Sequence, residues 1–183
     1  QKKISILAQK YNFKIIEDAS HSIGAKHYGE PVGSCKWSDI TVFSFHPVKI
    51  ITTGEGGAAL TNNKLLAEKM KLFRSNGLNK EIKDNKNKPW YYQHLSSGFN
   101  YRMNDLSAAL GLSQINRLKK FLSKRNEIAS IYKRYLIDLP IKFQKIEKYN
   151  YSSYHLLVVQ FDLSKTKHNY KQIFKRMREK NYY

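Results

Sequence analysis

Apolar residues recur along the chain with two periods, one typical of helices and one of strands. Near the start they lie three or four positions apart, which predicts a helix over residues 4–11. Its apolar face consists of Ile4, Leu7, Ala8 and Tyr11. Segments 13–18 and 38–46 are rich in β-branched and aromatic residues, and we predict that they form strands, with a third strand at 56–62.

A helical period returns after these strands, at residues 63–77. Asn62 or Asn63 can cap the first turn of this helix, and Gly77 can end it. The following segment, 79–97, is polar and interrupted by a proline, so we predict a long loop. A loop of this length in a compact domain is usually functional or disordered.

Two further helical segments follow the predicted loop. Asn104 or Asp105 can cap a helix over residues 105–118, and a longer amphipathic helix runs to about residue 137. The apolar side of the longer helix consists of Leu118, Leu122, Ile128, Tyr132 and Tyr135.

The pattern changes after Pro140, where we predict a strand at 154–162 and a helix at 169–181. Helices alternate with short buried strands before this point, which predicts an α/β layered domain. The later strand and helix indicate the beginning of a second, α+β lobe. Because a parallel sheet needs more strands than these, we expect the chain to be an internal piece of a larger architecture.

Composition limits the classes of protein to consider. The 183 residues are 41% hydrophobic and 13% aromatic, which is enough for a folded core. No apolar run approaches the roughly 18 residues that cross a bilayer, and no signal peptide opens the sequence, so no membrane partner is expected. The single cysteine, Cys35, excludes an internal disulfide framework and fits the reducing cytoplasm.

The net charge of +19 permits two interpretations. One is a nucleic-acid or other polyanion partner, and the other is a lysine-rich solvated surface. No block of five like charges occurs, and the densest basic stretch, INRLKKFLSKRNE, follows a helical pattern with an apolar stripe. No recognition-helix, zinc or RNP pattern is present, so a nucleic-acid-binding module is the less favoured alternative.

The stretch FSFHPVKIITTGEGGAAL, residues 43–60, places a lysine among apolar residues and ahead of three glycines. Loss of hydration disfavours the charged form of an amine, and a neutral amine forms Schiff bases with carbonyl groups. The alternative is that Lys49 extends from a strand end and pairs with a carboxylate such as Glu55. The glycines permit either close backbone approach or a simple hairpin.

Two polar residues that precede this lysine lie at the ends of predicted strands. Asp18 ends one strand and can accept a hydrogen bond from a protonated ring nitrogen, or it can simply cap the next turn. Ser44 ends another strand, where its hydroxyl can hold a phosphate or be an ordinary strand-end serine.

Three stretches in this order resemble the consecutive signatures of the DegT/StrS-type sugar aminotransferases. They are EDASHSIGA, FSFHPVKIITTGEGGAALTN and FNYRMNDLSAALGLSQINRL. Members of this family are pyridoxal 5'-phosphate (PLP) enzymes with the aspartate aminotransferase fold, fold type I. The resemblance implies that residues 1–120 are part of the PLP-binding large α/β domain. It also implies that residues 121–183 form a connecting helix and an incomplete small α+β domain.

The resemblance also implies roles for individual residues. Lys49 would form the Schiff base with PLP and carry the proton in catalysis, and Asp18 would pair with the pyridinium nitrogen. His21 would lie close to the cofactor ring, although a satisfied turn histidine is the alternative. Ser44 would bind the cofactor phosphate, and Asn100 would reach across a dimer interface to the phosphate in the other subunit.

Within the family, SFHPVK and KLFRSNGLNK look most like transaminases that act at C4 of UDP-linked 4-keto-6-deoxy sugars. The implied partners are a UDP-sugar substrate, glutamate as the amino donor and a second copy of the chain in a homodimer. A neighbouring branch that performs dehydration has histidine in place of the lysine, so Lys49 favours amino transfer. The alternative is a catalytically silent member that retains the fold as a regulator or scaffold.

Overall fold

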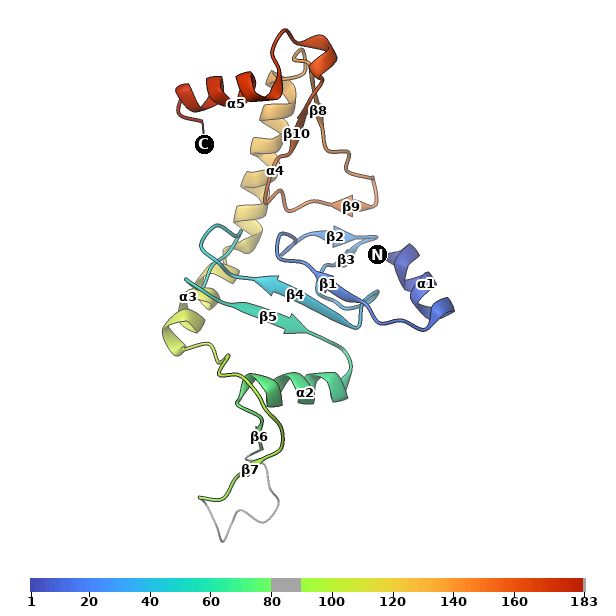
Figure 1. Cartoon of the computed structure of the whole chain (residues 1–183), viewed down its shortest axis with the longest axis vertical. Helices are drawn as coiled ribbons and strands as arrows, with labels where there is room; N and C mark the ends of the chain where they lie inside the picture. The colour runs from blue at the N-terminus through green and yellow to red at the C-terminus, as the bar shows by residue number, and fades with distance from the viewer. Residues whose placement is uncertain (80–89, 183) are drawn as a thin grey trace.

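A computed structural model describes residues 1–79 and 90–182 of the chain (Figure 1). Groups of short strands lie between the helices. In chain order they are α1 (Lys2–Tyr11), β1 (Ile16–Asp18), β2 (Lys26–His27), β3 (Glu30–Pro31), β4 (Ile40–Ser44), β5 (Gly57–Leu60), α2 (Lys64–Arg74), β6 (Leu78–Asn79), β7 (Gln93–His94), α3 (Asp105–Ile115), α4 (Leu118–Tyr135), β8 (Ile141–Phe143), β9 (Asn150–Tyr151), β10 (Val159–Phe161), a 3₁₀ turn (Leu163–Lys165) and α5 (Tyr170–Glu179).

A three-stranded sheet in the order β1-β4-β5 confirms the three predicted strands of the first half. β1 runs parallel to β4, with Asp18 opposite Val42, and β5 returns antiparallel to β4, with Ser44 opposite Gly57. Because β1 and β4 are parallel, their carboxyl ends lie at the same edge of the sheet. Ligands of open α/β sheets bind outside this edge.

The buried apolar residues concentrate around the segment that follows β4. Ile50 and Ile51 are 5% and 2% exposed, and Phe43 in β4 is also buried. Burial of one such side chain contributes about 1.5–3 kcal/mol. The apolar residues that flank Lys49 in the sequence therefore anchor its loop to the core.

Three of the predicted helices begin at a residue whose side chain caps the first turn. These caps show which residue of each pair, Asn62 or Asn63 and Asn104 or Asp105, is the capping residue. Asn63, and not Asn62, caps α2 by accepting a hydrogen bond from the Leu66 amide, and Asn104 caps α3 through the Ser107 amide. Asn169 begins α5 in a reciprocal capping box. Each cap stabilises its helix by about 1 kcal/mol.

The predicted strand at 154–162 is wrong in its first half. Only Val159–Phe161 forms a strand, β10, which pairs antiparallel with β8. The Arg125 guanidinium of α4 donates instead to the backbone carbonyls of Tyr154 and His155, at 3.1 and 3.3 Å. These carbonyls face a side chain rather than a neighbouring strand, so the backbone stays irregular there.

The segment predicted as a long loop, 79–97, contains part of a short hairpin. β6 and β7 pair at Leu78 opposite His94, and residues 80–89 lie outside the described part of the chain. α4 extends from the β1-β4-β5 sheet toward β8, β10 and α5, so it connects the first half of the chain to the last elements (Figure 1).

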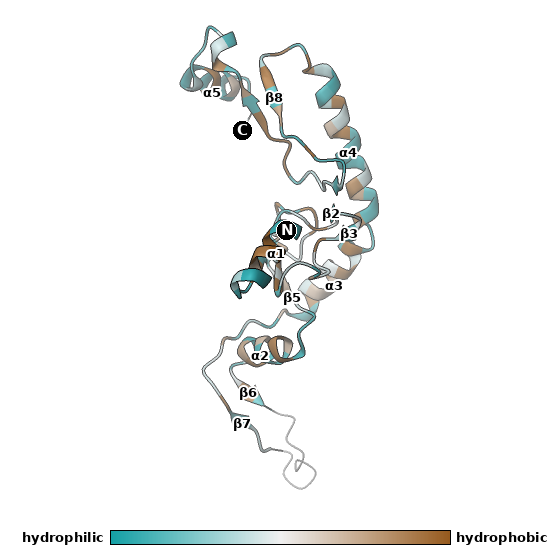
Figure 2. Ribbon diagram, turned by 90° about the vertical axis from the view of Figure 1, so that its right-hand side faces the viewer, coloured by the Kyte–Doolittle hydropathy of each residue, from teal (hydrophilic) through white to brown (hydrophobic). Residues whose placement is uncertain are grey.

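Both terminal helices contain apolar residues (Figure 2), and several of their side chains are exposed. On α1 only Ala8 of the predicted face is buried, while Leu7 and Tyr11 are exposed. On α5 Tyr170 and Phe174 are exposed, although the helix lies where the sequence predicts it. No helix in the described ranges is long and apolar enough to cross a bilayer.

Candidate active site

Asp18 is held in an ionised state at the carboxyl end of β1. Its Oδ1 accepts hydrogen bonds from the Ser20 hydroxyl at 2.6 Å and the Ser20 amide at 3.0 Å. These two bonds lower the pKa of Asp18, and the electrostatic interaction with the nearby His21 and Lys49 side chains lowers it further. An ionised carboxylate is therefore available near Lys49 at neutral pH.

Lys49 lies half-buried in the loop that joins β4 to β5. Its amide donates to the His46 carbonyl at 2.9 Å, and the buried Ile50 and Ile51 follow it directly. Glu55, the alternative partner for the ammonium, lies 3.7 Å from His46 Nε2 instead. Among the described residues, Lys49 forms no ion pair, so its amine is not committed to a carboxylate.

The glycines of this loop allow the chain to return closely along β4. A side chain at Gly57 would bring its Cβ within 2.7 Å of the Phe43 carbonyl oxygen, and Gly54 has a φ of +79°. The hairpin and the close backbone approach are thus both present. Ser44, at the end of β4, accepts a long 3.4 Å hydrogen bond from the His46 amide, which leaves its hydroxyl hydrogen free to donate.

A second histidine, His155, reaches the site from the segment before β10. Its ring lies 4.3 Å from the His21 ring, and Ser153, buried beside it, donates to the His21 carbonyl at 3.0 Å. His155 Nδ1 is buried and has no hydrogen-bond partner within the described ranges. Burial lowers the pKa of His155, and the charges of His21, Lys49 and Arg125 lower it further.

Sequence reasoning missed His155 because it assigned the whole 154–162 segment to a strand. The available signal was the group of polar residues, Ser152, Ser153 and His155, immediately ahead of an apolar run. Such a group is uncommon at the start of a buried strand.

The lowered pKa of His155 predicts a pH-dependent contribution to stability. In the unfolded chain a histidine titrates near pH 6.5, so below this pH the unfolded state binds more protons than the folded state. The fold therefore loses stability as pH falls from about 6.5 toward the lower pKa of His155 in the folded state. We expect wild type to lose more free energy of unfolding than His155→Gln between about pH 7.5 and pH 5.

Urea unfolding of both proteins at the two pH values measures this difference. His94→Gln removes an exposed histidine from β7 and serves as the control. An equal loss of free energy of unfolding in wild type and His155→Gln would contradict a lowered pKa of His155.

Asn100 is not brought to this site by its own chain. It is exposed on the segment between β7 and α3 and forms an isolated bridge with Ser75. Within the described ranges, no hydrogen bond or ion pair connects it to the Lys49 loop. The structure therefore groups Asp18, His21, Ser44 and Lys49 at one edge of the sheet and leaves Asn100 exposed beside Ser75.

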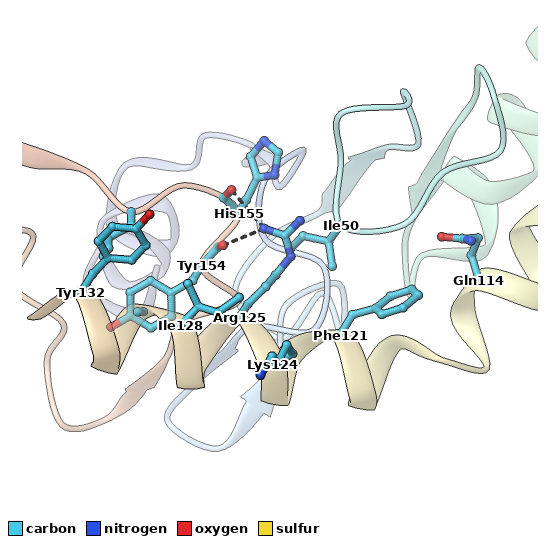
Figure 3. A pocket seen from close by; sticks show the side chains of 11 residues that line it. Ile50, Gln114, Phe121, Lys124, Arg125, Ile128, Tyr132, Tyr154 and His155 are labelled. Carbon is cyan, nitrogen blue, oxygen red and sulfur yellow. Dashed lines mark hydrogen bonds between the residues drawn. The ribbon is translucent and has the colours of Figure 1, made fainter. Parts of the chain in front are cut away.

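A mainly apolar pocket of about 550 Å³ lies between α4 and the segment that carries His155 (Figure 3). Ile50, the residue after Lys49, contributes to it, so the pocket adjoins the site. Its other lining residues include Phe121, Arg125, Ile128, Tyr132 and His155.

The donor set fits a pyridine cofactor that carries an aldehyde and a phosphate. An amine free of carboxylate partners suits the aldehyde, an ionised carboxylate suits a protonated ring nitrogen, and a hydroxyl with a free hydrogen suits a phosphate. Lys49, Asp18 and Ser44 provide these three groups.

Comparison with known proteins supports this interpretation. The profile of the DegT/DnrJ/EryC1/StrS aminotransferase family matches residues 2–182. Over 155 residues the chain is 44% identical to the UDP-4-amino-4,6-dideoxy-N-acetyl-beta-L-altrosamine transaminase of Campylobacter jejuni subsp. jejuni serotype O:23/36 (strain 81-176). The match covers 84% of this chain and 39% of that protein, so the chain spans well under half the length of this curated relative.

Solved structures show the same fold. Helicobacter pylori PseC, an aminotransferase involved in the biosynthesis of pseudoaminic acid, has a TM-score of 0.84 and 34% identity, covering 98% of this chain and 46% of that one. The putative sugar aminotransferase Spr1654 from Streptococcus pneumoniae, in its PLP-form, has a TM-score of 0.73 and 26% identity, covering 85% and 39%. These similarities confirm the predicted α/β aminotransferase fold class.

The family match over nearly the whole chain and the identity to the Campylobacter relative lead to one conclusion: this chain belongs to the DegT/DnrJ/EryC1/StrS aminotransferase family.

Proposed function

We propose that this chain supplies the lysine-bearing part of a PLP-dependent nucleotide-sugar aminotransferase. The enzyme would transfer an amino group from glutamate to the C4 keto carbon of a UDP-linked 4-keto-6-deoxy sugar. The observation that carries the proposal is the meeting of Asp18, His21 and Lys49 outside the carboxyl ends of β1 and β4. The similarity to a UDP-sugar transaminase supports the substrate class.

Bound PLP would supply an electron sink for the carbanion that forms at the amine-bearing carbon. Lys49 Nζ would hold the cofactor covalently and, when released, would move the proton between C4′ of the cofactor and the substrate carbon. The loop anchored by Ile50 and Ile51 fixes the backbone from which this amine extends. An amine without a carboxylate partner can serve both purposes, because no ion pair has to be broken first.

The remaining residues would bind and orient the cofactor. Asp18 Oδ2, which accepts no hydrogen bond within the described part of the chain, is available to the ring nitrogen. An opposite charge there favours the protonated nitrogen. Ser44 would donate to the phosphate, and the exposed His21 would lie beside the ring, supported by its carbonyl contact with Ser153.

We also propose a homodimer in which the active sites are shared. Asn100 would bind the cofactor phosphate of the partner subunit, which agrees with its exposure and, within the described ranges, with its lack of a hydrogen bond or ion pair to its own Lys49 loop. In this assignment residues 1–120 belong to the cofactor-binding domain and residues 121–183 to the connecting helix and the small domain. The free thiol of Cys35 supports a reducing compartment, the cytoplasm.

Amino transfer tests the proposal directly. The chain, and a chimera that adds the upstream region of the Campylobacter relative, would be mixed with PLP, glutamate and a UDP-4-keto-6-deoxy sugar. We expect a visible absorbance band on PLP addition and formation of the UDP-4-amino sugar, measured by mass spectrometry. If both proteins stay colourless, the proposal is wrong. If both bind PLP without turnover, the silent regulator or scaffold is supported instead.

A further inference from the structure

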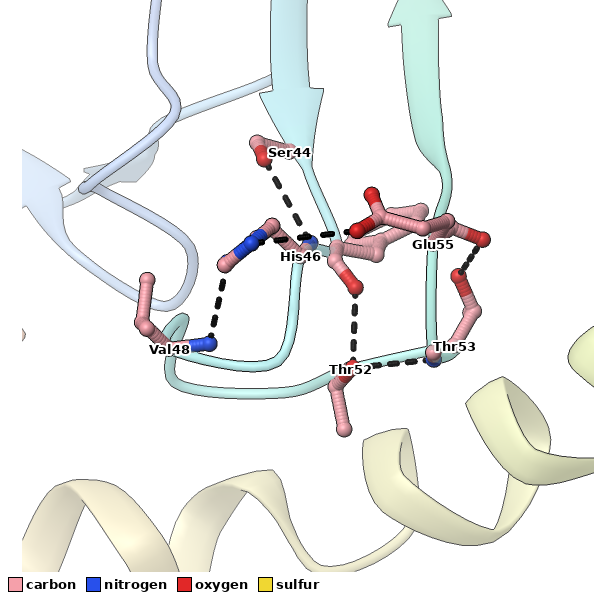
Figure 4. A network of polar contacts seen from close by, with 8 residues as sticks. Ser44, His46, Val48, Thr52, Thr53 and Glu55 are labelled. Atoms are coloured by element: carbon pink, nitrogen blue, oxygen red, sulfur yellow. Dashed lines mark hydrogen bonds and ion pairs between the residues drawn. The ribbon is translucent and has the colours of Figure 1, made fainter.

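His46 has contacts through its carbonyl and both ring nitrogens, all within the turn that carries Lys49 (Figure 4). Its Nδ1 accepts a hydrogen bond from the Val48 amide at 3.2 Å, and its carbonyl accepts one from the Lys49 amide at 2.9 Å. Its Nε2 lies 3.7 Å from the Glu55 carboxylate. Pro47 has no amide hydrogen, so the Val48 and Lys49 amides are the first two donors after His46.

These contacts define the state of the imidazole. A ring nitrogen that accepts a hydrogen bond carries no proton, so Nδ1 is the bare nitrogen. The proton of the neutral ring is then on Nε2, on the side of Glu55. This carboxylate is 80% exposed, so its attraction to the ring is screened by solvent. It orients the ring less than the hydrogen bond from the Val48 amide to Nδ1 does.

The two ends of the Lys49 turn are held by different means. After Lys49 the buried Ile50 and Ile51 fix the backbone, and Thr52 and Thr53 bond back to the Phe45 carbonyl. Before Lys49 the exposed Val48 provides little packing, so the hydrogen bonds to His46 constrain the backbone there. Loss of the Nδ1 acceptor would free the residue that precedes the reactive amine.

We propose that His46 is a positioning residue, which presents the Lys49 amine to the cofactor by accepting the Val48 amide hydrogen at Nδ1. This inference rests on the proposed function, in which Lys49 carries the cofactor. It assigns the effect to one ring nitrogen, and two amide side chains can distinguish the two nitrogens. The side-chain oxygen of asparagine can replace Nδ1 as the acceptor, and the side-chain nitrogen of glutamine can replace Nε2.

Covalent trapping at Lys49 is the first test. Wild type, His46→Asn, His46→Gln and His46→Ala would be incubated with PLP and reduced with borohydride, and the label at Lys49 quantified by peptide mapping. We expect His46→Asn to retain labelling within about twofold, and His46→Gln and His46→Ala to lose about tenfold, as for one lost hydrogen bond in an exposed turn. Glu55→Gln, the matched control, should stay within about twofold of wild type.

Hydrogen exchange of the peptide over residues 45–52 is a second readout that needs no cofactor. We expect the Val48 and Lys49 amides to exchange faster in His46→Gln and His46→Ala and to stay protected in His46→Asn. Thermal unfolding of all four proteins identifies any variant that loses the fold, and His46→Asn keeps the test valid if His46→Ala does so.

The two readouts separate this inference from the function on which it rests. Absence of label at Lys49 in wild type contradicts the proposed function, and the exchange data then decide whether Nδ1 holds the turn. Normal wild-type labelling with equal labelling of all His46 variants overturns the inference alone. Preservation by glutamine but not by asparagine also overturns it, because Nε2 would then be the effective nitrogen.

Discussion

Replacement of Lys49 by alanine is expected to remove the reducible PLP adduct and to lower amino transfer by at least about 10²–10⁴-fold, the contribution typical of a positioned proton-transfer group. Lys49 provides an amine without a carboxylate partner at the end of the sheet that also carries Asp18 and His21. Alanine keeps the backbone contacts of the turn, since the Lys49 amide still donates to the His46 carbonyl.

The measurement combines single-turnover kinetics with peptide mapping after borohydride reduction. Lys64→Ala is the control. The Lys64 side chain is 89% exposed at the start of α2, and its Nζ lies 4.0 Å from a Glu68 carboxylate oxygen, so its ion pair is weak. The control should keep wild-type labelling and rate. Label that persists in Lys49→Ala, or that maps to another lysine in wild type, would contradict the assignment.

Replacement of Asp18 by asparagine is expected to give the second-largest effect, a loss of about 10–10³-fold in kcat/KM. A charge partner of this kind shifts a pKa by about 1–3 units, and each unit changes the protonated fraction of the ring nitrogen tenfold. Asparagine has the same shape and still accepts the Ser20 hydrogen bonds, so the turn after β1 should survive. The PLP absorbance spectrum should change in parallel.

The chain offers a close control for this variant. Asp162 has the same local arrangement, with Oδ1 accepting from the Ser164 hydroxyl at 2.6 Å and the Ser164 amide at 3.3 Å, and the hydroxyl bond likewise lowers its pKa. It precedes the 3₁₀ turn after β10, and β10 pairs with β8 and not with the β1-β4-β5 sheet (Figure 1). Equal effects of Asp18→Asn and Asp162→Asn would show that the turn, and not the cofactor contact, is responsible.

The elements predicted correctly from the sequence are those with a local cause. The Asn63 and Asn104 caps act within three residues, and the β-branched segment before Ser44 favours a strand wherever it can be buried. The two-residue strand β9 has no such pattern, because it forms by pairing with β2, more than 120 residues earlier in the chain.

The same distinction explains which site residues could be predicted. Asp18, Ser44 and Lys49 occur in continuous motifs, so their neighbourhood is encoded within about 30 residues of sequence. His155 enters the site through a contact between Ser153 and His21, which are 132 positions apart. Its position also depends on Arg125 binding two carbonyls of an irregular segment, and no periodic pattern predicts this contact.

The exposed apolar residues of α1 and α5 leave hydrophobic surface open to other molecules. Tyr11, Tyr170 and Phe174 are each more than half exposed, which resembles the surface that chaperones and quality-control proteases recognise in incompletely folded proteins. Aggregation of the chain at high concentration should therefore decrease when another surface covers these helices.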